Sequence, residues 1–130
     1  MSKRNQRTDK ELVVELALPA AAANAQTKSL DMQGAVENCE LELGCEATAN
    51  LVAEKTITLK VQESDDNSNF ADAPWAPTVV VTGKTGNGSD AAARRIGIPS
   101  TAKRYMRAYA ATLAAGGDNT AKKFSLKACF

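Results

Sequence analysis

The chain has 130 residues and a mass of 13.7 kDa, which suits one compact domain rather than two independent ones. It contains no histidine, so the commonest general base and the commonest zinc ligand are both missing. A net charge of +1 predicts no bulk attraction to nucleic acid, and every apolar stretch is far shorter than the roughly 20 residues that cross a bilayer. We therefore expect neither a membrane nor a direct nucleic-acid partner.

Charge is unevenly distributed along the chain. Residues 31–72 carry ten acidic side chains and two lysines, whereas residues 94–130 carry eight basic side chains and one aspartate. If acidic and basic strands are neighbours in a sheet, these charges pair across it. The alternative interpretation is one acidic and one basic face, through which the protein meets copies of itself or another charged surface. The sequence leaves both open.

The first part of the chain is predicted to be a flexible basic arm, residues 1–11, followed by a single domain over residues 12–130. The apolar residues that follow the arm resemble a secretory signal that ends near Ala25. Glu15 lies in the middle of that stretch, so we expect residues 12–18 to form a strand of the domain instead. Residues 19–26 begin with a proline and are rich in alanine, which predicts a loop or a short helix.

Alternating apolar and polar residues predict strands at 28–32, 36–46 and 56–62. The second of these has an acidic outer face, and its inward residues are Cys39, Leu41, Leu43 and Cys45. Residues 64–69 are turn formers whose side chains can bond to nearby backbone. Their Asp65, Asn67 and Asn69 match the start of a calcium loop, but the glycine and glutamate that such a loop needs are replaced by Phe70 and Ala76. We expect an ordinary polar turn there.

The second half of the chain continues the pattern. Pro74 and Pro77 keep their segment out of a central strand position, and residues 78–82 predict a strand of the buried type. The loop that follows is rich in glycine, but its Gly83-Lys84-Thr85 lacks the first glycine of a phosphate-binding loop. Further strands are predicted at 94–98, 103–113 and 123–130, with a helical turn over 110–115 as the alternative for the end of the second. About eight strands without a long helix predict an all-β fold, an antiparallel β-sandwich or jelly roll.

The residues give little support to catalysis. No serine or cysteine has a plausible base nearby in the sequence, so we expect no enzymatic activity, and we expect neither a cofactor nor a metal. The odd set of cysteines, Cys39, Cys45 and Cys129, argues against a closed disulfide framework and favours buried small apolar side chains. Arg104 and Arg107 alternate with two tyrosines, as on a surface that binds single strands, but tyrosines packed at a rim under arginines explain the pattern better.

Three stretches together resemble the capsid cement (decoration) proteins of tailed phages, which have a jelly-roll fold. They are Lys28-Ser29-Leu30-Asp31-Met32, the run from Thr56 to Phe70 that contains Gln62-Glu63-Ser64-Asp65, and Ile98-Pro99 followed by Lys103-Arg104-Tyr105-Met106-Arg107. The resemblance covers roughly residues 28–110. It departs from the family pattern where Met32-Gln33-Gly34 replaces a tighter Leu-Gly pair, and the basic arm need not be shared.

The resemblance implies a structural protein of the virion that binds the outside of an icosahedral head, as trimers, and clamps neighbouring major capsid subunits. Its partners would then be the major capsid protein and itself. Candidate capsid contacts are the basic residues Lys3, Arg4, Arg7, Lys10, Arg94, Arg95, Arg104 and Arg107. The alternatives are another phage head or tail component, a carbohydrate-binding β-sandwich whose platform would use Trp75, Tyr105 and Tyr109, and a single-strand nucleic-acid binder.

Overall fold

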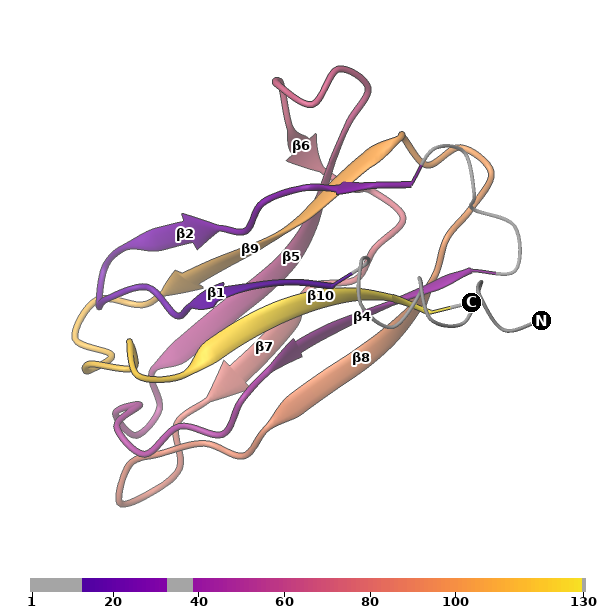
Figure 1. Ribbon diagram of the computed structural model, residues 1–130. Helices are drawn as coiled ribbons and strands as arrows, with labels where there is room; N and C mark the ends of the chain where they lie inside the picture. Colours follow the sequence, from indigo (N-terminus) through magenta and orange to yellow (C-terminus); the bar gives the residue numbers. More distant parts are fainter. Residues whose placement is uncertain (1–12, 33–38, 130) are drawn as a thin grey trace.

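The computed structural model describes residues 13–32 and 39–129, and over them the chain folds into ten β-strands without a helix. Two antiparallel sheets lie face to face (Figure 1). The predicted all-β sandwich is therefore confirmed. The basic arm, with Lys3, Arg4, Arg7 and Lys10, lies outside the described residues.

Each sheet alternates strands from the two halves of the chain. The four-stranded sheet consists of β1 (Val13–Ala17), β10 (Lys123–Cys129), β4 (Glu40–Cys45) and β8 (Ala92–Gly97), in that spatial order. In the six-stranded sheet, β9 (Tyr105–Thr112) and β5 (Thr56–Ser64) are central. Its edges are formed on the β9 side by β2 (Asn24–Gln26) and β3 (Leu30–Asp31), and on the β5 side by β6 (Ala71–Asp72) and β7 (Val79–Thr82).

The strand pairing is that of a jelly roll. Strands of the first half pair with strands of the second half in reverse order: β1 with β10, β2 and β3 with β9, β4 with β8, and β5 with β6 and β7. A chain folded double and then rolled up produces this order. Because β2 and β3 both lie along β9, and β6 and β7 both lie along β5, the ten strands occupy the eight positions that the sequence predicts.

Two edge segments differ from the sequence-based prediction. Residues 24–26, within the predicted loop or short helix, form β2 because β9 offers its free edge to their backbone. Residues 79–82 form β7 as expected, but not as a buried strand. This strand pairs only with β5, so Val81 points inward while Val80 remains 56% exposed.

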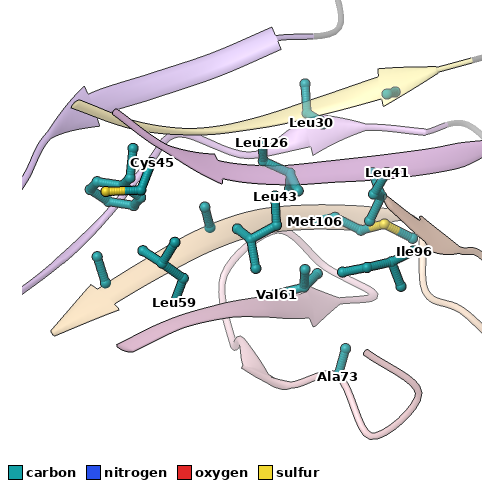
Figure 2. Close-up of a cluster of buried hydrophobic side chains, with 14 of the residues drawn as sticks. Leu30, Leu41, Leu43, Cys45, Leu59, Val61, Ala73, Ile96, Met106 and Leu126 are labelled. Carbon is teal, nitrogen blue, oxygen red and sulfur yellow. The ribbon is translucent and has the colours of Figure 1, made fainter. Parts of the chain in front are cut away.

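The core lies between the two sheets and is supplied by the alternating residues that the sequence marks as inward (Figure 2). Ile57, Leu59 and Val61 of β5 face Leu41 and Leu43 of β4, and each of these side chains is at most 2% exposed. Phe124 is the largest fully buried side chain. Burial of this apolar surface is the dominant stabilising contribution to the fold.

Two of the three cysteines belong to this core. Cys39 and Cys45 are buried, as the sequence predicts. Burial, with the adjacent Glu46 carboxylate, raises the pKa of the Cys45 thiol to about 11. A thiol with such a pKa is almost entirely protonated near neutral pH and therefore a poor nucleophile.

The apolar stretch near the start of the described chain is structural. It forms β1, which pairs with β10 along five residues, and the next residue, Leu18, is 1% exposed in the core. This strand agrees with the one that the sequence predicts at residues 12–18. Within the described ranges, the protein has no helix of the length and apolar character required to cross a membrane.

Candidate functional site

Acidic and basic side chains pair across the outer face of the four-stranded sheet. The acidic strand β4 lies between the basic strands β10 and β8. Arg95 Nη1 on β8 lies 3.4 Å from Glu40 Oε1 of β4, and Lys123 Nζ on β10 lies 3.3 Å from Glu15 Oε1 of β1. The described residues thus show pairing within a sheet, as the first interpretation of the charge pattern predicts.

A shallow depression of about 360 Å³ lies on this same face, where small side chains form the floor. Gly44, Ala93 and Ser125 supply that floor, and Glu15, Glu42 and Lys123 lie around it. The charged groups at the rim already have partners, since Glu15 pairs with Lys123 and Glu42 with Arg95. This depression therefore offers few free groups to a ligand.

The outer face of the six-stranded sheet is organised around Arg107. The alternation of β9 buries Met106, Ala108 and Ala110 and turns Arg107 outward, between the two tyrosines. Arg107 Nε donates a hydrogen bond to Gln62 Oε1 on β5 at 2.9 Å. Its guanidinium lies 4.1 Å from the centre of the Phe70 ring, and partial burial lowers its pKa from the ordinary value. Stacking and hydrogen bonding together hold the side chain in one place.

Gln62 connects Arg107 to a second group of charges. Its amide donates to Asp72 Oδ1 on β6 at 3.0 Å, and Lys60 Nζ donates to Asp72 Oδ2 at 3.1 Å. The same lysine lies 5.7 Å from the centre of the Tyr109 ring. The carboxylate of Asp72 is thereby committed to Lys60 and Gln62, and it does not neutralise Arg107.

Arg104 forms a separate group directly before the start of β9. It binds both carboxylate oxygens of Asp31, at 2.8 and 2.9 Å, and lies over the Tyr105 ring at 5.0 Å. A fork-like pair of this kind fixes geometry, although exposed ion pairs add little stability. It ties the β3 edge to β9.

A pocket of about 430 Å³ lies beside Arg107. Ser29 Oγ, between β2 and β3, donates a 2.6 Å hydrogen bond to Asn67 Oδ1 in the turn after β5. Because β9 lies between these two segments, this hydrogen bond connects the segments on either side of β9. The pocket is lined by Thr27, Lys28, Ser29, Asn67, Phe70 and Arg107. We call it the Arg107 pocket.

The turn that forms one wall of the Arg107 pocket is organised by Asp66. Its Oδ1 accepts hydrogen bonds from the backbone N–H groups of Ser68 and Asn69, both at 2.9 Å, and from the Ser64 hydroxyl at 2.8 Å. These bonds hold the pKa of Asp66 well below its ordinary value. They allow Asn67 to adopt a left-handed conformation, with φ of 59°, that points its side chain at Ser29. The predicted polar turn is confirmed.

Acidification is expected to weaken the fold through this turn. The lowered pKa means that the charged Asp66 stabilises the folded state above its ordinary pKa of about 3.9, and that this contribution is lost as the pH falls through the folded-state value. Urea unfolding at a series of pH values should show stability falling from about pH 4 downward. An Asp66→Asn variant should be less stable at neutral pH, with the difference from wild type shrinking in acid. A difference independent of pH would contradict this account.

The structure does not gather the candidate arginines in one patch. Arg95 lies on the outer face of the four-stranded sheet, whereas Arg104 and Arg107 lie on the opposite outer face of the sandwich. Arg94 is exposed on β8, in register with the buried Leu43. An inward-directed charge on an edge strand discourages pairing with another sheet edge.

Sequence reasoning did not identify Lys28, Gln62, Asn67 and Phe70 as parts of a site. All four lie in the stretches that resemble cement proteins, but only Gln62 is placed on the outer face by the alternation of its strand. Trp75, considered for a sugar-binding platform, packs half-buried against the core and donates from its indole to Glu63. Across residues 13–32 and 39–129, no cluster of His, Cys, Asp and Glu side chains could hold a metal ion.

Comparison with known proteins supports the fold. The chain is similar to a protein whose structure is described as the crystal structure of the PBSX exported protein XepA, with a TM-score of 0.56 and 18% sequence identity. The match covers 90% of this chain and 36% of that one, so this chain spans little more than a third of that protein. No protein-family model and no curated protein matches the sequence. At this identity, the similarity concerns the fold.

Proposed function

We propose that this protein is a phage structural protein and, more specifically, a cement protein that binds the outside of an icosahedral head and stabilises contacts between major capsid subunits. The observation that carries the proposal is the position of the three stretches that resemble cement proteins. Leu30–Asp31 pairs with Tyr105 and Met106 of β9, and Gln62 pairs with Arg107. The three stretches thus contribute the neighbouring strands β3, β9 and β5 of one sheet, and their outward residues Asp31, Gln62 and Arg107 share its outer face.

The structural comparison adds support of a more general kind. The similar protein belongs to the phage PBSX, so a fold of this kind occurs among phage proteins. We propose that the function is binding and not catalysis, since hydrogen bonding and stacking hold the candidate site residues in place and burial keeps the Cys45 thiol protonated.

Mass spectrometry of purified phage particles tests the proposal. A cement protein should be present at hundreds of copies per head, since the resemblance implies a repeated contact with the capsid lattice. It should also be degraded by protease added to intact particles, because it lies on the outside. Absence from particles would overturn the proposed function.

A second candidate is an exported phage protein that is not part of the particle, because the similar structure is that of an exported protein. The same mass spectrometry separates the two. An exported protein would be found in the culture medium and not in particles purified away from it.

Assembly into trimers is a further part of the proposal. It is supported by two exposed apolar side chains, Val80 and Leu113, which are 56% and 49% exposed beside Thr58 and Thr56 at one end of the six-stranded sheet. Apolar area on an outer face is stabilised by burial against another copy. Light scattering coupled to size-exclusion chromatography should give three times the chain mass of 13.7 kDa. A clean monomer would contradict trimers in solution.

The basic arm is proposed to strengthen capsid binding, because its residues 1–10 carry four basic side chains and one acidic side chain. Deleting residues 1–10 should leave the circular dichroism spectrum and the unfolding midpoint unchanged, since the domain begins after them, and should weaken binding to heads. Rim charges of this kind act chiefly on association rate and register. Equal binding of the truncated and the full chain would reject this role.

A further inference from the structure

The Arg107 pocket contains two cations that have no carboxylate partner among the described residues. Arg107 donates from Nε to Gln62, and its guanidinium stacks on the Phe70 ring. Its two terminal nitrogens have no hydrogen-bond partner among the described residues. Lys28, at the opposite wall, takes part in no ion pair within the same ranges. Two positive charges at one pocket attract an anion more strongly than either alone.

The acidic side chains around the pocket are already occupied. Asp72 binds Lys60 and Gln62, Asp66 binds the backbone of its own turn, and Asp31 binds Arg104. None of these three lines the pocket. The Nδ2 atom of Asn67 adds a further donor, since only the Oδ1 atom of that side chain is used by Ser29. The pocket therefore offers donors to a ligand that brings its own acceptor oxygens.

The geometry suits a carboxylate in particular. A guanidinium presents its N–H groups as a planar fork that two carboxylate oxygens match. Gln62 and Phe70 hold Arg107 in place before a ligand arrives, so little side-chain entropy is lost on binding. The volume of about 430 Å³ accommodates more than a lone carboxylate, so the acid group is carried on a larger body.

The larger group that carries the carboxylate is more consistent with a protein side chain than with a sugar. Sugar platforms present a free aromatic face, but the Phe70 ring is stacked against Arg107, and the indole of Trp75 is held by Glu63. We propose that the Arg107 pocket is the binding site for an aspartate or glutamate side chain of a protein partner, with Arg107, Lys28 and Asn67 as its donors. This inference rests on the proposed function only for the identity of that partner, because the site can be tested with a small ligand alone.

Titration followed by NMR tests the pocket with the full chain. The probe is glutamate blocked at both ends, N-acetyl-glutamate N-methylamide, and the matched neutral ligand is the corresponding glutamine compound. We expect the Arg107 Nε–Hε signal and the backbone amides of Lys28 and Asn67 to shift with the glutamate probe, with a dissociation constant in the millimolar range. The glutamine compound should cause no such shifts.

Variants establish which residues are responsible. Arg107→Met should weaken binding about tenfold or more, while Arg95→Met, on the opposite face, should leave it unchanged. If Arg107→Met fails to fold, Lys28→Met provides the second test, because this exposed side chain has no structural partner among the described residues, and it should weaken binding several-fold. Retained affinity in either pocket variant would overturn the proposal.

Two further ligands distinguish other anions. Glucuronate binding as tightly as the glutamate probe would overturn the assignment to a protein side chain, and inorganic phosphate binding as tightly would overturn the preference for a carboxylate. The absence of any shift with the glutamate probe would overturn the site itself. None of these experiments uses phage heads. The proposed carboxylate site can therefore be refuted while capsid binding is supported, or the reverse.

Discussion

Replacing Gly83 by alanine is expected to destabilise the fold by about 3 kcal/mol or more, a loss of roughly 10 °C in the unfolding midpoint. An added Cβ would clash with the Val52 carbonyl oxygen and would lie 2.9 Å from that of Leu51. Both neighbours are backbone atoms, so relief requires the chain at residues 51–52 to move. Leu51 is fully buried, and Gly83 exchanges backbone hydrogen bonds with Lys55 and Glu54, so that movement disturbs the core and the ladder together.

Gly97→Ala is the matched control for this substitution. Gly97 also lies in a β-sandwich edge region, at the end of β8, but a Cβ there meets nothing within 4 Å. We expect the control to change the free energy of unfolding by no more than about 0.5 kcal/mol, measured by urea denaturation. Equal stability of both variants would mean that the close contact between residues 51–52 and Gly83 does not exist.

Removing the buried carboxylate of Glu63 is the second change with a large expected effect. Glu63 is 6% exposed, and its Oε1 accepts hydrogen bonds from Trp75 Nε1 at 2.9 Å and from the backbone N–H of Lys103 at 3.0 Å. In a Glu63→Ala variant both donors lose their acceptor. We expect the free energy of unfolding to fall by about 3 kcal/mol. Hydrogen bonds to a charged group are stronger than neutral ones, and a buried donor without an acceptor is destabilising.

The single tryptophan makes this contact visible. Trp75 is the only one in the chain, so its emission reports on the Glu63 contact directly. Glu63→Ala should shift the emission to longer wavelength as the indole loses its partner and gains water. Glu63→Gln keeps an acceptor oxygen and should lose only about 1 kcal/mol, with emission near that of wild type. Wild-type emission and stability in the alanine variant would show that the carboxylate does not hold these segments together.

Much of the fold follows from the alternation of apolar and polar residues along the strands. Strands β5, β9 and β10 combine apolar inward residues with polar outward ones at a period of two, and such segments have one stable placement on a half-buried sheet. The short edge strand β2 carries no such pattern in its three residues, and it forms because β9 has an unpaired edge beside it. The solvent position of Val80 likewise depends on which strand lies next to β7, which composition does not encode.

The candidate site was less accessible to sequence reasoning. The alternation of β9 predicts that Arg107 and the tyrosines share a face, and the structure confirms this. It could not predict that Phe70, far along the chain, stacks on Arg107, since that contact depends on the direction of the turn set by Asp66. Glu63 was missed for a related reason. Its position continues the inward alternation of β5, but its two donors come from separate loops.

The most direct test of the central claim is binding of the purified protein to heads that lack it. Heads of the encoding phage, prepared from a strain without this gene, are mixed with the full chain and sedimented, and the bound protein is counted against the major capsid protein. The account predicts saturation at a fixed ratio, with heads that resist heat or chemical disruption better than before. Protein that stays in the supernatant at every concentration, with no change in head stability, would contradict a cement function.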